Sequence, residues 1–121
     1  MEISYWIVAA LLAVFYLYAG GKKVVQSQER LQPMMGWVDT VPMPFVRVIG
    51  VLEVLGSAGL ILPPLTGIAP WLAIAAAIGL VLIQIGGIAL HLSRGEAGKI
   101  GLNIVLLAAA AVTAWLGTVW L

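Results

Sequence analysis

The sequence has no cysteine and very little charge. The lack of cysteine excludes disulfide bonds, iron–sulfur clusters, thiolate metal sites and thiol catalysis. Six basic and five acidic residues among 121 give a net charge of +1, which offers no basis for binding nucleic acid. Only 9% of the chain is charged, against about 25% in soluble domains, and 63% is hydrophobic. These values exclude a water-soluble or disordered chain and indicate a small integral membrane protein.

Four apolar runs account for most of the chain. As a helix rising about 1.5 Å per residue, each is long enough to cross a hydrocarbon core of about 30 Å. The spans must be helices and not strands, because a segment in lipid has to satisfy its own backbone hydrogen bonds. We therefore predict an all-α, membrane-embedded four-helix bundle that forms a single domain over residues 1–121. Its predicted transmembrane helices are residues 3–21, 45–62, 70–92 and 100–121.

The three connections differ in length and chemistry. Residues 22–44 form the longest one, and residues 93–99 are expected to make a short polar hairpin. Between the second and third spans, Pro63 and Pro64 predict a tight turn, because proline cannot continue a helix.

All the cations lie on one side of this predicted topology. The positive-inside rule then places the first and third connections in the cytoplasm and both termini outside, in a multi-pass protein of the cell membrane. The tryptophans agree, since four lie near the outer ends of their helices: Trp6, Trp71, Trp115 and Trp120. The simplest role for four of the cations is to anchor anionic lipid: Arg47, Lys22, Arg94 and Lys99.

The polar residues within the spans form a cluster that starts at the cytoplasmic side and stops near the middle of the bilayer. Counting from the helix ends places Glu53 and Gln84 about 12 Å deep. Helical spacing puts Gln84 and His91 on one face of the third span, and Tyr16 and Lys23 on one face of the first. The candidate ligand-binding or proton-relay residues are Glu53, Lys23, His91, Gln84, Asn103 and Tyr16.

Glu53 is the most informative of these residues. A carboxylate at that depth costs at least a few kcal/mol, so it must be paired, protonated or functional. One interpretation is that Glu53 only locks the helices in register through hydrogen bonds or an ion pair. The other is that it binds or relays a proton, or anchors a polar group of a ligand. With a single histidine, His91, we expect no metal site.

Two glycine-containing stretches carry a family resemblance, together with His91 at the end of the third span and Asn103 at the start of the fourth. The stretches are Ala19-Gly-Gly-Lys-Lys23-Val and Val48-Ile-Gly-Val-Leu-Glu53-Val-Leu-Gly56-Ser-Ala-Gly-Leu-Ile-Leu-Pro63. From Leu11 to about Trp115 the chain resembles the DoxX-like family of small four-helix membrane proteins. The resemblance places the family's first-helix lysine on Lys23, and it implies a compact bundle.

Three functions remain open after this resemblance. The first is a binding or accessory subunit with a cytoplasm-facing polar pocket around Glu53, for which the resemblance alone adds a link to quinones and membrane oxidoreductases. The second is an assembly factor or scaffold for other membrane proteins. The third is a dimeric, proton-coupled exporter of small molecules. Beside the lipid bilayer, the expected partners are a second copy of the chain or a membrane complex, and we expect no independent catalytic activity.

Overall fold

The computed structural model describes residues 1–33 and 35–121. Within this part of the chain, four helices are long and apolar enough to cross a membrane, which confirms the predicted fold class. They are α1 (Glu2–Val25), α3 (Met43–Thr66), α4 (Leu72–Ser93) and α5 (Gly101–Leu116), which continues as the 3-10 helix η3 (Gly117–Trp120). Shorter helices in the connections are α2 (Gln28–Leu31), η1 (Gly36–Asp39) and η2 (Ala97–Lys99).

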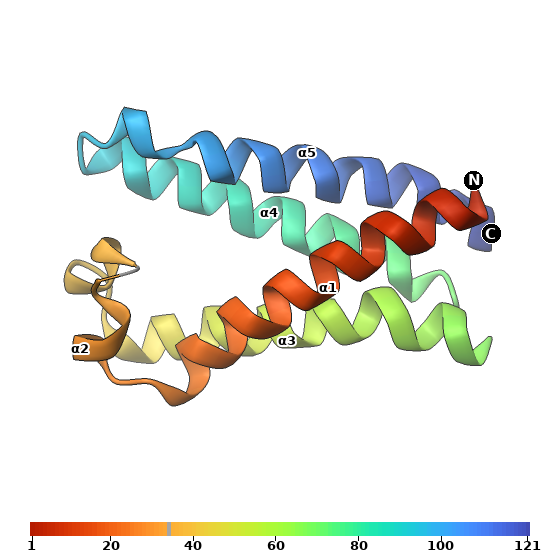
Figure 1. The fold of residues 1–121 in the computed structure, drawn as a ribbon, viewed down its shortest axis with the longest axis horizontal. Coiled ribbons are helices and arrows are strands. Elements are labelled where there is room, and N and C mark those ends of the chain that lie inside the picture. Colours follow the sequence, from red (N-terminus) through yellow and green to blue (C-terminus); the bar gives the residue numbers. More distant parts are fainter. Residues whose placement is uncertain (34) are drawn as a thin grey trace.

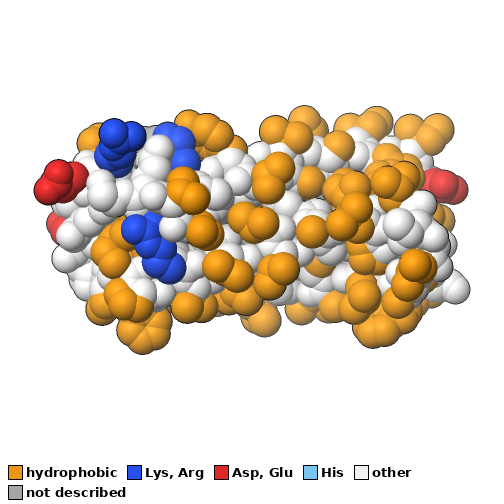
Figure 2. Space-filling model, turned by 90° about the horizontal axis from the view of Figure 1, so that it is seen from below, with side chains coloured by type: hydrophobic (Ala, Val, Ile, Leu, Met, Phe, Trp, Pro, Cys, Tyr) orange, Lys and Arg blue, Asp and Glu red, His pale blue; other side chains and the backbone are white. Residues whose placement is uncertain are grey.

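The two ends of the bundle have different contents (Figure 1). Both chain termini lie at one end, called here the terminal end, and the first and third connections lie at the other, called the charged end. Helix α1 runs obliquely, so that it lies beside α5 at the terminal end and beside α3 at the charged end. Figure 2 shows lysine and arginine side chains gathered at the charged end, with hydrophobic side chains covering the surface between the ends.

Helices α1 and α3 pack closely through two glycines. A Cβ atom added at Gly50 would lie 2.7 Å from the carbonyl oxygen of Gly20, and one added at Gly20 would lie 2.8 Å from that of Gly50. No side chain fits at such distances, so the two backbones can touch only because both residues are glycine. The contact brings Lys23 of α1 against Gly50 of α3. Glu53 lies one helical turn after Gly50, so the two charged side chains come close to each other.

The predicted turn at Pro63 and Pro64 is wrong. Helix α3 continues through both prolines to Thr66 and ends at Gly67, which adopts the left-handed conformation with φ of 74°. Proline at position 64 has no N–H to donate to the carbonyl of Leu60, four residues earlier. The Tyr5 hydroxyl of α1 donates to this carbonyl instead, at 2.6 Å. A side chain from another helix thus replaces the missing backbone bond, as helices in lipid require.

Aromatic rings fill the terminal end. Tyr5, Trp6 and Trp120 contact each other edge to face, with ring centroids 5.3 to 5.6 Å apart. Trp6 and Trp120 are therefore half-buried in the bundle, whereas Trp71 and Trp115 are exposed as the predicted belt requires. Below the rings a core of aromatic and aliphatic side chains continues along the bundle, including Ala9, Leu12, Leu60, Ala77, Leu80 and Ala110.

The first connection folds over the charged end and has a small core of its own. Leu31, Val38 and Val46 are buried together, which holds α2 and η1 against the start of α3. The Gln28 amide donates to the Val38 carbonyl at 3.1 Å and links the two short helices. The connection is therefore a folded element and supplies side chains to the site described next.

Candidate functional site

A buried ion pair joins α1 to α3. The Lys23 ammonium donates a hydrogen bond to Oε1 of Glu53, and the two residues are 7% and 2% exposed. Glu53 is therefore paired, which is one of the states that the sequence allows for a carboxylate at this depth. Among the described residues, no hydrogen bond reaches the second carboxylate oxygen, Oε2. The ion pair therefore satisfies one oxygen of Glu53 and leaves the other with acceptor capacity.

A chain of hydrogen bonds crosses the bundle next to the ion pair. The Asn103 amide of α5 donates to Oε1 of Gln84 at 2.8 Å, and Nε2 of Gln84 donates to the Tyr16 hydroxyl at 2.6 Å. Glycine at position 87 of α4 leaves room for this chain, because a Cβ atom there would lie 2.7 Å from the Asn103 amide nitrogen. The chain thus ties α1, α4 and α5 together.

Two cavities open on either side of these polar groups. The larger, of about 590 Å³, lies between α1 and α5 and reaches the first and third connections. The smaller, of about 320 Å³, lies between α3 and α4 and is lined by Ile49, Gly86 and Leu90 among others. We call them the α1–α5 cavity and the α3–α4 cavity.

The two cavities share a wall of polar and aromatic side chains. The residues that line both are Lys23, Trp37, Glu53, Gln84, His91 and Asn103. Five of these were predicted from the sequence, and the sixth predicted residue, Tyr16, is fully buried behind Gln84. Trp37 was not predicted as a site residue. Its ring lies 5.7 Å from Lys23 Nζ, an arrangement that favours the ammonium charge.

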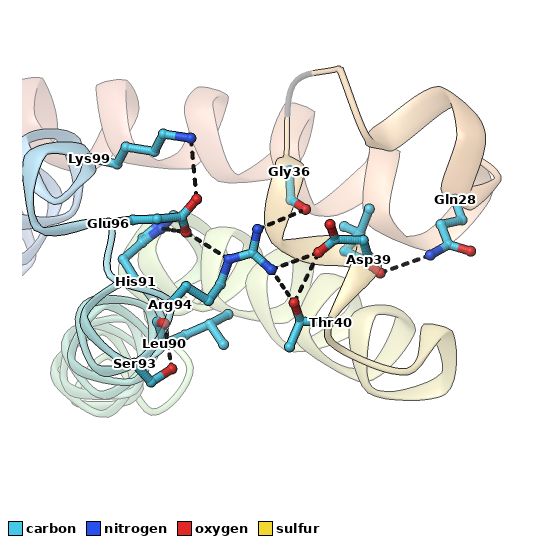
Figure 3. Close-up of polar contacts among 11 residues, drawn as sticks. Gln28, Gly36, Asp39, Thr40, Leu90, His91, Ser93, Arg94, Glu96 and Lys99 are labelled. Carbon is cyan, nitrogen blue, oxygen red and sulfur yellow. Dashed lines mark hydrogen bonds and ion pairs between the residues drawn. The ribbon is translucent and has the colours of Figure 1, made fainter.

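Arg94 connects the two loops of the charged end (Figure 3). Its guanidinium donates to Oε1 of Glu96 at 2.7 Å, to Oδ1 of Asp39 at 2.6 Å, and also to the Thr40 hydroxyl. A longer bond of 3.4 Å reaches the carbonyl of Gly36. Because Gly36 belongs to the wall of the α1–α5 cavity, this set of contacts, called here the Arg94 cluster, ties the first connection to the loop after α4 at the cavity mouth.

Glu96 lies at the centre of the cations in this loop. Besides Arg94, it contacts Nδ1 of His91 at 3.1 Å and the Lys99 ammonium at 3.2 Å. These donors, Arg94 above all and then His91, lower the pKa of Glu96 from its ordinary value of 4.5 to about 2. The pKa of Asp39 is lowered too, chiefly by its hydrogen bonds from Arg94 and then Thr40.

The cations predicted as lipid anchors have protein contacts. Arg47 donates to the carbonyl oxygens of Lys23 at 2.7 Å and Gln26 at 2.5 Å, and so satisfies the last turn of α1. Lys22 lies 4.9 Å above the Tyr18 ring. Lys99 has a largely exposed side chain that reaches Glu96. The contact of Lys22 with Tyr18 lies within α1 at i, i+4, whereas the contacts of Arg47 could not be read from the sequence, because they depend on how α3 packs against the end of α1.

In the half of the bundle toward the terminal end, two hydroxyls bond to the backbone of their own helices, while the buried indole nitrogen of Trp120 has no hydrogen-bond partner among the described residues. The Ser57 hydroxyl donates to the Glu53 carbonyl of its own helix at 3.0 Å, and Thr113 donates to Ala109 at 2.7 Å. Tyr5 is engaged with Leu60 as described above. Within residues 1–33 and 35–121, no group of His, Asp and Glu side chains is arranged to hold a metal ion.

These features define a four-span helical membrane protein with a buried ion pair and a buried chain of hydrogen bonds inside the bundle. Residues 7–113 match the DoxX-like family, which covers most of the chain. The protein therefore belongs to the DoxX-like family. No curated protein and no solved structure matches the sequence.

Proposed function

We propose that the protein is a small membrane subunit that binds the polar head group of a lipid-like molecule next to Glu53. Lys23, Gln84 and His91 supply hydrogen bonds to this head group, and the apolar walls of the cavities accept the rest of the molecule. By family resemblance the bound molecule can be a quinone in its hydroxyl-bearing reduced form, and the subunit can belong to a redox-linked membrane complex.

The observation that carries this proposal is the state of the Glu53 carboxylate. It is almost completely buried, yet only one of its oxygens receives a hydrogen bond from the described residues, and it lines two cavities. A residue that only locked the helices in register would not need adjacent cavities. Mostly apolar walls with a few convergent polar groups are typical of small-molecule sites.

The two other functions receive less support. An exporter needs access to Glu53 from both ends, whereas the aromatic rings and the core fill the bundle toward the terminal end. An assembly factor needs an exposed recognition surface, and the polar groups described here are mostly turned inward. Binding of a small amphiphile therefore uses more of the observed features than either alternative.

The proposal can be tested by measuring which molecules stay bound to protein extracted from its membrane. Native mass spectrometry in a mild detergent should detect a bound small molecule on the wild type. Glu53→Gln keeps the shape of the side chain but removes its charge, and we expect the folded variant to lose this molecule.

Ser57→Ala provides the matched control, because Ser57 is buried one helical turn away and bonds only its own helix. The control should retain the bound molecule. If Glu53→Gln retains it as well, or if the wild type carries none, Glu53 has a purely structural role.

We propose the membrane orientation separately, on the cations gathered at the charged end. Both termini lie together at the opposite end, so a reporter that is active only outside the cytoplasm should be active when fused after Leu121. Activity of a cytoplasmic reporter at that site would reverse the orientation. Because the chain has no cysteine, single cysteines placed in the connections can check the result with impermeant thiol reagents.

A further inference from the structure

We infer that the molecule bound at Glu53 is an uncharged amphiphile with a hydroxyl in its head group, and that its apolar chain leaves between α3 and α4 to lie in a groove on the outside of the bundle. This inference rests on the proposed function and names the chemical class of the ligand and its path. Three features of the α3–α4 side carry it, and they concern hydrogen bonding, charge and the continuity of the groove with the cavity.

The hydrogen-bonding requirement comes from Glu53. Its free oxygen, Oε2, accepts but cannot donate, so the group that satisfies it must carry an O–H or N–H. The Lys23 ammonium has three protons, and among the described residues only Glu53 receives one of them. A hydroxyl can donate to Oε2 and accept from Lys23 at the same time, so it satisfies both partners.

The charge requirement follows from the residues that line the α3–α4 cavity. Lys23 and Glu53 carry opposite charges and already form a pair. The remaining ionisable residue in the described lining is His91, whose Nδ1 contacts Glu96. A phosphate or carboxylate would therefore meet no unpaired cation among these residues, while it would face the carboxylate of Glu53. An uncharged head group avoids this repulsion and the cost of burying a net charge.

The groove begins where the α3–α4 cavity ends. Ile83 lines both, and the groove continues along α3 and α4 toward the terminal end with a volume of about 490 Å³. It is almost entirely apolar, and its rims are the exposed side chains of Leu52, Leu55 and Leu82. Gly79 forms part of its floor, and a Cβ atom added there would meet no atom within 4 Å. A chain attached to a head group at Glu53 can therefore pass Ile83 and lie in this space.

The test uses two monoacylglycerols that share a head group and differ in chain length, oleoylglycerol and octanoylglycerol. Their apparent Kd is measured by native mass spectrometry with the detergent-solubilised full chain. Gly79→Leu fills the groove without a clash, since the space at Gly79 is open. We expect this substitution to raise the Kd of oleoylglycerol by about tenfold or more, because several methylenes of its chain lose their burial. Octanoylglycerol, whose chain is too short to fill the groove, should bind with nearly unchanged Kd.

Gly21→Leu is the matched control. Gly21 also has open space around it, but it lies on α1 outside both cavities and the groove. It should leave the Kd of both probes unchanged. The charge requirement is tested with oleoyl lysophosphatidic acid, which adds a phosphate to the same glycerol and chain, and which should bind at least about tenfold more weakly than oleoylglycerol.

The outcomes separate the two proposals. If Gly79→Leu does not raise the Kd of oleoylglycerol, the groove holds only bulk lipid. The proposed path of the chain between α3 and α4 is then refuted, while binding at Glu53 stands. If the lysophosphatidic acid binds as tightly as oleoylglycerol, the uncharged class is refuted. If both monoacylglycerols bind Glu53→Gln as tightly as the wild type, they do not use the site and this inference is refuted, while the proposed function is decided separately by the molecule that the protein carries from its membrane.

Discussion

The terminal end and the charged end of this bundle solve the same problem in different ways. Each must hold helices together in lipid, where burying apolar side chains gives little driving force. The terminal end does so with touching aromatic rings and with the Tyr5 bond to the Leu60 carbonyl, and it is filled. The charged end uses the buried ion pair, the amide chain and the Arg94 cluster, and it encloses cavities. Polar contacts can support open space in a membrane bundle, because a few directional bonds hold the helices where close packing is interrupted.

Among substitutions that test this difference between the two ends, Lys23→Met is expected to lower the unfolding free energy most. This change leaves Glu53 buried without its partner, and breaking a buried pair in this way costs about 3 to 5 kcal/mol of unfolding free energy. Denaturation in detergent micelles measures the loss. The double variant Lys23→Met with Glu53→Leu removes both charges, and it should recover most of the stability. A double variant as unstable as the single one would show that the pair does not act as a unit.

The second largest loss of stability is expected where α1 and α3 touch. Gly50→Ala places a Cβ atom 2.7 Å from the Gly20 carbonyl, so the helices must separate, at a cost of about 1 to 3 kcal/mol. Denaturation in detergent micelles should show Gly79→Ala to be neutral or slightly stabilising, because space is open at Gly79 and alanine favours a helix. Equal effects of the two substitutions would contradict the packing described for Gly20 and Gly50.

At the terminal end, Tyr5→Phe should remove the donor to the Leu60 carbonyl and leave it unsatisfied, which costs about 1 to 3 kcal/mol. Pro64→Ala restores the backbone N–H that can reach this carbonyl. The cost of Tyr5→Phe, measured as a shift in unfolding free energy, should therefore be smaller in the Pro64→Ala background. Additive effects of the two changes would show that the hydroxyl does not replace the missing backbone bond.

The smallest effect is a pH dependence confined to the charged end. The pKa of Glu96 is lowered in the folded protein, so its contacts stabilise the fold fully above pH 4.5, and this contribution is lost as the pH falls toward about 2. Melting temperature should thus be flat near neutrality and fall within that window. Glu96→Gln should flatten the slope there, whereas a slope unchanged by this substitution would assign the acid response to other groups.

The sequence predicts the helices and most of the site, and the reason is periodicity. Apolar length identifies the spans, and counting depth along each helix brings Glu53 and Gln84 to one level without any knowledge of packing. The same count leaves Lys23 at the membrane boundary, and only the folded chain shows its ion pair with Glu53. Contacts between distant segments escape this reasoning. The continuation of α3 through Pro64 depends on a tyrosine from another helix, and the Arg94 cluster depends on two connections that meet only in the folded chain.

The pairing of Lys23 with Glu53 has a consequence for the electrical behaviour of the protein. Moving one elementary charge across a membrane potential changes its energy by about 2.3 kcal/mol per 100 mV. The pair sums to zero wherever its shared proton lies, so the potential does no net work when an uncharged molecule arrives beside it or leaves. Occupancy of the site would then follow the abundance of that molecule in the bilayer and stay the same in energised and de-energised membranes.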